Sequence, residues 1–161
     1  MHTFQVHPFE PLWDEHSQIL ILGSFPSVRS REIGFYYGHP QNHFWKLMSI
    51  LYQDDMPYSV AERKSFALKH GFALWDAIKS CTITGSSDSS IREAVPNDIA
   101  FLLRNSSIQR VFCNGCEAFK LYERYCAPEC GMRVTLLPST RAANAAWSIE
   151  KLAESWKIIL P

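Results

Sequence analysis

The sequence lacks an excess of charge and has no long apolar run. Its 161 residues carry 16 basic and 16 acidic side chains, so the formal net charge is zero. This balance argues against general binding of nucleic acid, which normally needs an excess of Lys and Arg, but it leaves room for a local basic patch. No segment is apolar enough to span a bilayer, and Met1–Phe4 has no charged-then-apolar signal pattern. We therefore expect a cytoplasmic protein that does not bind membranes.

The sequence also lacks an even number of cysteines. The five cysteines are an odd number, which argues against a closed disulfide framework. Two pairs, Cys113 with Cys116 and Cys126 with Cys130, have spacings that a four-thiolate metal site would use. However, Cys113 ends a predicted strand and Cys116 begins a predicted helix, whereas metal ligands more often lie on turns. We expect reduced thiols, with no metal and no cofactor.

Other absences narrow the function further. The chain has no Gly-x-x-x-x-Gly-Lys run, which argues against an NTPase. No histidine follows His70, which argues against a thiol hydrolase built on Cys81 or Cys116, because such a thiol needs a neighbouring base. We find no internal repeat and no linker, and the length predicts a single domain over residues 1–161.

Short apolar runs alternate with helical patterns along the chain. The four predicted strands are Ile19–Leu22, Phe72–Trp75, Arg110–Cys113 and Arg133–Leu137. The predicted helices are Asn42–Leu51, a segment from Ser59 that stops before Gly71, Ile99–Asn105 after a capping Asn97 or Asp98, Glu117–Tyr125 and Ser148–Leu160. This alternation predicts an α/β fold, a three-layer α/β/α sandwich around a short central parallel four-stranded sheet.

Four predicted loops hold nearly all the unusual residues. They are Gly23–Ser27, Asp76–Ser90, Asn114-Gly115 and Pro138–Asn144. Each follows a predicted strand, and parallel strands bind ligands where their carboxyl ends meet. We therefore expect the site at that edge of the sheet.

Three motifs show a family resemblance. They are Gly-Ser-Phe-Pro-Ser at 23–27, Gly-Phe-Tyr-Tyr-Gly-His-Pro-Gln-Asn-His-Phe-Trp at 34–45 and Leu-Pro-Ser-Thr at 137–140. Together they resemble the uracil-DNA glycosylase superfamily, most closely its hypoxanthine-DNA (deoxyinosine) glycosylases, and next the mismatch-specific uracil/thymine-DNA glycosylases. The segments 73–76, 85–88 and 96–98 also resemble the first branch, so the resemblance covers roughly residues 17–147.

The resemblance implies a DNA-repair glycosylase that acts on a deaminated base flipped out of DNA, hypoxanthine first and uracil second. It implies that Asn42 is catalytically essential. Phe25 stands where mismatch-specific relatives place an asparagine that positions water, and a hydrocarbon ring cannot do this. Arg141 stands where relatives often carry a leucine wedge, so we expect Arg141 to contact the DNA strand.

The chemistry of base removal agrees with these residue types. Breaking an N-glycosidic bond places negative charge on the departing base, which aimed amides and backbone N–H groups can stabilise without a metal. A covalent route would need an amine, and Lys79 is the single lysine in the four predicted loops. We therefore predict a monofunctional hydrolase that does not cleave the strand.

Each predicted site residue also has a simpler interpretation. The predicted base-binding residues are Gly23, Ser24, Phe25, Tyr37, Phe44, Asn114 and Ser139. The predicted DNA-binding residues are Ser27, His39, Pro138, Thr140 and Arg141. Asn42 is also a suitable helix cap. Tyr37 would stack on the base but is also an ordinary core aromatic. Phe44 lies on a helix face and Asn114 in a turn, so core and turn roles stay open for both.

Other functions remain open at this point. They are a mismatch-specific uracil/thymine-DNA glycosylase, a small-molecule hydrolase, and a non-catalytic binder of flipped or single-stranded bases. In the favoured interpretation the partner is DNA that contains deaminated bases. We expect a monomer with no obligate protein partner.

Overall fold

The central sheet is parallel and has the strand order β3-β2-β6-β7. Its strands are β2 (Ile19–Gly23), β3 (Phe72–Asp76), β6 (Arg110–Asn114) and β7 (Val134–Leu137). The computed structural model describes residues 2–144 and 146–161. All four predicted strands are confirmed, with ends within one residue of those expected.

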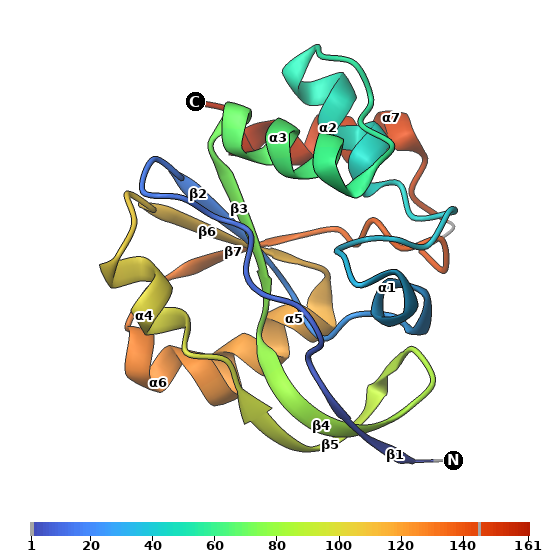
Figure 1. Cartoon of the computed structure of the whole chain (residues 1–161), viewed down its shortest axis with the longest axis vertical. Helices are drawn as coiled ribbons and strands as arrows, with labels where there is room; N and C mark the ends of the chain where they lie inside the picture. The colour runs from blue at the N-terminus through green and yellow to red at the C-terminus, as the bar shows by residue number, and fades with distance from the viewer. Residues whose placement is uncertain (1, 145) are drawn as a thin grey trace.

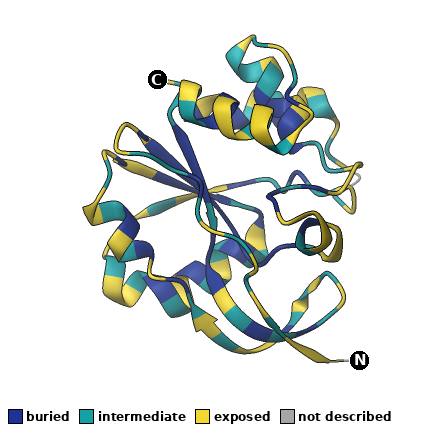
Figure 2. Cartoon of the chain, viewed as in Figure 1, coloured by how far each residue is buried: buried dark blue, intermediate teal, exposed yellow. Residues whose placement is uncertain are grey.

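Helices cover both faces of this sheet (Figure 1). One face carries α2 (Phe44–Tyr52), α3 (Val60–His70) and α7 (Ile149–Trp156), and the other carries α4 (Ile99–Arg104), α5 (Cys116–Leu121) and α6 (Ala127–Cys130). The strands can support two layers because successive side chains point to opposite faces. In β2, Ile19 and Ile21 pack into one core and Leu20 and Leu22 into the other. The predicted α/β/α sandwich is confirmed, and Figure 2 shows its buried strands between half-exposed helices.

Local sequence signals account for several helix ends. Ser59 and Glu62 form the predicted capping box of α3, which ends at Gly71 with φ of 76°. Asp98, not Asn97, caps α4 by accepting a hydrogen bond from Phe101. Near the C-terminus, α7 continues into the short 3-10 helix η2 (Lys157–Ile159).

The helix predicted over Glu117–Tyr125 lies within a longer helical run. This run consists of α5, a π-helical turn η1 (Tyr122–Cys126) and α6, which follow one another directly. Cys116 does begin α5, as expected.

The loop predicted over Asp76–Ser90 is wrong. This segment forms β4 (Ile78–Thr84) and the start of β5 (Ser87–Pro96), which pair with each other. Strand β4 also pairs with β1 (Thr3–Val6), which gives an antiparallel sheet of order β1-β4-β5. Ile78, Cys81 and Ile83 are buried, but irregular pairing in β4 breaks the two-residue alternation that would have indicated a strand. Helix α1 (Val28–Ile33), which directly follows the first predicted loop, was not among the predicted helices.

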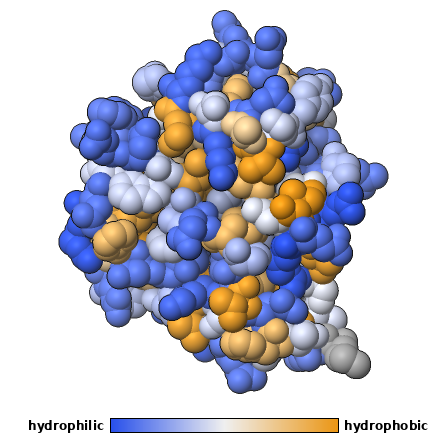
Figure 3. All heavy atoms as spheres, viewed as in Figure 1, coloured by the Kyte–Doolittle hydropathy of each residue, from blue (hydrophilic) through white to orange (hydrophobic). Residues whose placement is uncertain are grey.

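No helix in the described ranges is long and apolar enough to cross a membrane. On the face drawn in Figure 3, hydrophobic side chains lie in separate small groups among hydrophilic ones.

Candidate active site

A cavity of about 300 Å³ lies where the parallel strands end, beside α1. Its volume is at the lower end of the range for ligand pockets. The predicted site residues that line it are Gly23, Ser24, Phe25, Ser27, Tyr37, His39, Asn42, Asn114 and Arg141. The segments that follow β2, β6 and β7 therefore meet at one place, as the topology predicts.

Four predicted site residues do not line the cavity. Phe44 is fully buried behind Tyr37, and the two rings stack with their centres 4.1 Å apart. Thr140 is also fully buried. The carbonyl oxygen of Pro138 accepts a hydrogen bond from Trp156, and Ser139 Oγ accepts one from the backbone N–H of Arg141. These residues support the wall of the cavity from behind.

A chain of hydrogen bonds fixes the side chain of Asn42. Its Oδ1 accepts from the backbone N–H of Phe44 at 2.9 Å and from Thr140 Oγ1 at 2.8 Å. Thr140 Oγ1 accepts from Asn114 Nδ2 at 3.0 Å, and the Thr140 backbone N–H donates to Asn114 Oδ1 at 3.0 Å. The hydroxyl proton of Thr140 must therefore point to Asn42, because its oxygen already accepts from Asn114.

These contacts determine which atom of Asn42 is available to a ligand. An amide oxygen has two lone pairs, and both are engaged by the two donors described above. The Nδ2 group has no partner among the described residues, and Asn42 lines the cavity. Asn42 therefore offers the cavity a donor. Its bond from Phe44, in the first turn of α2, agrees with the capping interpretation too, although His43 is the residue at the N-cap position.

Tyr37 combines an unusual backbone with a buried hydroxyl. Its φ is 53°, in the left-handed region that non-glycine residues rarely adopt, and such strain often occurs at functional sites. Among the described residues, its hydroxyl is the one buried side-chain polar atom without a hydrogen-bond partner. Burial raises the pKa of Tyr37 well above its ordinary value, and the negative charge of Asp76 adds to the shift. Tyr37 is therefore neutral at physiological pH.

The backbone of the loop Gly23–Ser27 lies close to the end of β3. A Cβ at Gly23 would collide with Oδ1 of Asp76, so any larger residue here would displace this carboxylate. Phe25 is largely buried, and the guanidinium of Arg31 lies 5.6 Å from the centre of its ring. The first loop thus forms a mostly apolar wall of the cavity.

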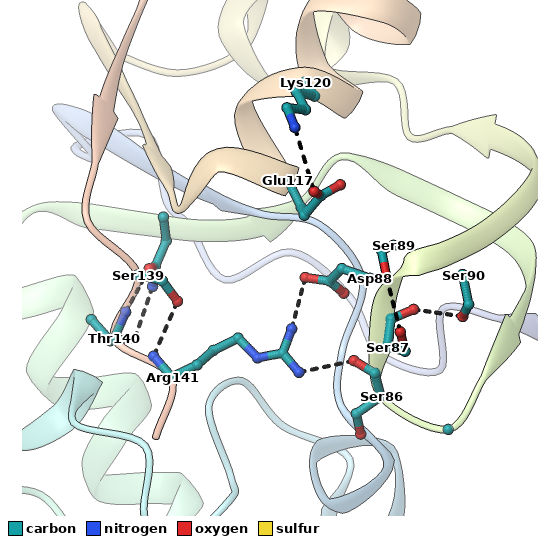
Figure 4. A network of polar contacts seen from close by, with 12 residues as sticks. Ser86, Ser87, Asp88, Ser89, Ser90, Glu117, Lys120, Ser139, Thr140 and Arg141 are labelled. Atoms are coloured by element: carbon teal, nitrogen blue, oxygen red, sulfur yellow. Dashed lines mark hydrogen bonds and ion pairs between the residues drawn. The ribbon is translucent and has the colours of Figure 1, made fainter. Parts of the chain in front are cut away.

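Arg141 reaches the turn of the β4–β5 hairpin (Figure 4). Its Nη1 lies 2.9 Å from Oδ2 of Asp88, and its Nη2 donates to the carbonyl oxygen of Ser86 at 2.9 Å. Burial raises the pKa of Asp88 above its ordinary value, and Ser24 and Arg141 oppose that shift. In this structure Arg141 therefore holds the hairpin against the segment that follows β7.

Several cavity residues were not predicted individually. They are Pro26, Ser30, Tyr36, Gln41, Asp76, Ser86, Asp88, Ala142 and Ala143. The structure pairs Asp76 with His7 at 2.7 Å. No motif includes His7, which lies 69 positions away from Asp76. The single sequence signal for Asp76 is that it directly follows the predicted strand Phe72–Trp75.

The cysteines do not form a group suited to a metal. Among residues 2–144 and 146–161, no three or more His, Cys, Asp or Glu side chains are arranged to hold an ion. Burial raises the pKa of Cys81 to about 11, and the pKa of Cys113 and of Cys126 to about 12. These thiols are protonated at neutral pH, and a protonated thiol is a poor nucleophile.

Comparisons with known proteins agree with this geometry. Residues 11–159 match the family model described as "Uracil DNA glycosylase superfamily". The chain is 35% identical over 153 residues to a protein named hypoxanthine DNA glycosylase from Methanosarcina acetivorans, covering 94% of this chain and 95% of that one. A protein of the same name from Methanosarcina barkeri is 36% identical over 95 residues, 58% of this chain and 60% of that one.

A solved structure is also similar. The solution NMR structure of a uracil DNA glycosylase candidate from Methanosarcina acetivorans superposes with a TM-score of 0.79 and 30% sequence identity. The match covers 94% of this chain and 93% of that chain.

Proposed function

The chain belongs to the uracil-DNA glycosylase superfamily and is a DNA N-glycosylase, and we propose that the base it removes is hypoxanthine, with uracil as a second substrate. The relatives named hypoxanthine DNA glycosylase support the choice of base. We include in the proposal that the protein acts as a single-domain cytoplasmic monomer and leaves the DNA strand intact.

The observation that carries the mechanism is the orientation of Asn42. In the reaction the bond between the base and C1′ of the sugar breaks, and its electron pair leaves with the base. A water oxygen then bonds to C1′, and a proton from that water ends on the base. Negative charge therefore develops on the purine, and a donor fixed before the reaction stabilises that charge without reorganisation. Asn42 Nδ2 is such a donor, because Phe44 and Thr140 hold its Oδ1.

The rest of the cavity suits an extruded base. Phe25 and Tyr37 provide aromatic surface, and contacts with aromatic rings stabilise bases outside the duplex by about 1–3 kcal/mol per base in single-strand binders. Flipping the base has an energetic cost of a few kcal/mol, which such contacts help to offset. Ser27, His39 and Arg141 lie at the cavity as well, and we assign them to the sugar-phosphate backbone.

The test is an activity panel on matched duplexes. The wild-type protein should leave alkali-labile sites in duplexes with inosine, more slowly in those with uracil, and none in an undamaged duplex. Asn42→Ala should be folded and slower by about 10²- to 10³-fold, the usual effect of losing one such donor. Asn105→Ala is the matched control. Asn105 is exposed at the C-terminal end of α4, and among the described residues its side chain bonds only to the carbonyl oxygen of Phe101 in the same helix. Tight binding to inosine DNA without any base release would contradict the proposal and favour a non-catalytic binder.

A further inference from the structure

Two arginines hold the turn of the β4–β5 hairpin from opposite sides. From the segment after β7, Arg141 pairs with Asp88 and donates to the carbonyl oxygen of Ser86, both at 2.9 Å (Figure 4). From α1, Nη2 of Arg31 donates to the carbonyl oxygen of Gly85 at 2.6 Å. Ser86, Asp88 and Arg141 also line the cavity. The turn and both guanidinium groups therefore lie beside the place where the extruded base enters.

The groups that hold the two arginines are chemically similar to a DNA phosphate. They are the carbonyl oxygens of Gly85 and Ser86 and the carboxylate of Asp88, so each of them is an oxygen acceptor. A guanidinium donates to such oxygens and to phosphate oxygens through the same N–H groups. In the protein without DNA, the hairpin turn therefore occupies donors that a strand passing the cavity could use.

The turn holds one arginine more firmly than the other. The partners of Arg31 are the carbonyl oxygens of Ser27 and Gly85, which carry no formal charge. Hydrogen bonds to a charged acceptor are roughly twice as strong, so a phosphate readily replaces a carbonyl. Arg141 instead pairs with the carboxylate of Asp88, whose side chain is 13% exposed, against 41% for Arg141. Asp88 is negatively charged, as a phosphate is, and therefore competes with DNA for Arg141.

Other hydrogen bonds fix the turn when the arginines leave it. The backbone N–H of Thr84 donates to Ser90 Oγ at 2.8 Å, and Ser90 Oγ donates to the carbonyl oxygen of Ser87 at 2.6 Å. On the side of α1, the backbone N–H of Val28 donates to Ser86 Oγ at 2.9 Å. The arginines can therefore exchange partners by rotation of their side chains, without unfolding of the hairpin.

We propose that Arg31 and Arg141 bind the DNA backbone from the two sides of the hairpin turn, and that Asp88 holds Arg141 on the turn until a phosphate replaces it. This inference rests on the proposed function, because it takes DNA as the substrate that approaches the cavity. No covalent bond changes, since each guanidinium exchanges one oxygen acceptor for another. Asp88 thus restrains DNA binding, and its removal should strengthen binding through Arg141.

The experiment measures, by fluorescence anisotropy, the dissociation constant for a duplex with a tetrahydrofuran abasic analogue, which has no base to release. The variants are Asp88→Asn, Arg141→Ala and the double variant, and Asp88→Ala removes the carboxylate oxygens as well as the charge. A stoichiometric titration gives the fraction of protein that binds, so partial unfolding does not alter the constant. Glu117→Gln is the matched control, because the charge of Glu117 also reaches Asp88 but its carboxylate pairs with Lys120.

We expect both Asp88 variants to bind about threefold to tenfold tighter, as the release of one partly exposed, charged hydrogen bond implies, and Glu117→Gln to change binding by less than about twofold. Without Arg141, Asp88→Asn should give no gain. Arg31→Ala should weaken binding and lower its salt dependence by about one phosphate contact.

Three results would overturn the inference. They are Asp88 variants that bind no tighter than the wild type, a gain that persists undiminished in the Arg141→Ala protein, and an unchanged salt slope in Arg31→Ala. Wild-type protein that binds this duplex but releases neither hypoxanthine nor uracil would instead overturn the proposed function alone.

Discussion

Substitution of Thr140 by valine tests whether this residue acts through Asn42. Thr140 is fully buried, and valine has nearly the same shape, so the change removes a hydroxyl without leaving a large cavity. Two hydrogen bonds are lost, the one received from Asn114 at 3.0 Å and the one given to Asn42 at 2.8 Å. Asn42 keeps its hydrogen bond from the backbone N–H of Phe44, so its side chain is held less firmly but does not turn around.

The magnitudes follow from these bonds. One neutral hydrogen bond contributes about 0.5–1.5 kcal/mol, which corresponds to a rate reduced by about twofold to tenfold. The Asn114 donor left without its acceptor reduces the free energy of unfolding by about 1–3 kcal/mol. For a chain of this length, each kcal/mol lowers the melting temperature by about 2–4 °C. Thr140→Ser keeps the hydroxyl and should stay close to the wild-type rate.

The assay is single-turnover release of hypoxanthine by the two single variants and the double variant. If Thr140 acts by orienting Asn42, Thr140→Val should have little further effect once Asn42 is alanine, because coupled residues are not additive. A double variant slowed by the full product of the two single effects would refute this reasoning. So would a Thr140→Val protein as slow as Asn42→Ala.

Further predictions concern the cavity wall, the surface and the thiols. Gly23→Ala should reduce base release strongly, since its methyl group collides with the carboxylate that ends β3; a wild-type rate would contradict this. Hydrogen bonds from His70 hold the pKa of Asp54 below its ordinary value, so Asp54 stabilises the fold above about pH 4 and loses this effect as pH falls. The difference in melting temperature between wild type and Asp54→Asn should therefore be present at pH 7 and shrink in acid. Arg141→Ala should weaken DNA binding and lower its salt dependence by about one phosphate contact; an unchanged salt slope would remove Arg141 from the DNA interface. Alkylation followed by mass spectrometry should label the exposed Cys116 before any buried thiol.

The sequence was sufficient for the parallel sheet and the helices around it. Ile19–Leu22 reads as a buried strand because all four of its side chains are covered by helices on both faces. The second sheet was not predictable in the same way. Irregular pairing interrupts the alternation of β4, and the serines of Ser86–Ser90 resemble a loop, although Ser87–Ser90 begin a strand.

The candidate site, like the fold, could be predicted only in part from the sequence. The motifs pointed to Asn42, and the topology indicated that the end of β6 would lie nearby. Thr140 was predicted as a DNA contact, yet its hydroxyl bonds to Asn42 across 98 positions of sequence. His7 had no signal at all, because its role depends on how β1 pairs with β4. Contacts between distant segments depend on tertiary packing, which local patterns do not encode.

The most direct test of the central claim is the single-turnover rate of hypoxanthine release by Asn42→Asp. Aspartate has almost the same shape and retains an oxygen to accept from Phe44 and Thr140, but it offers no N–H to the departing base. If Asn42 stabilises the leaving base as a donor, this variant should be at least as slow as Asn42→Ala. An Asn42→Asp protein that releases hypoxanthine at the wild-type rate would show that the donor plays no part in the reaction.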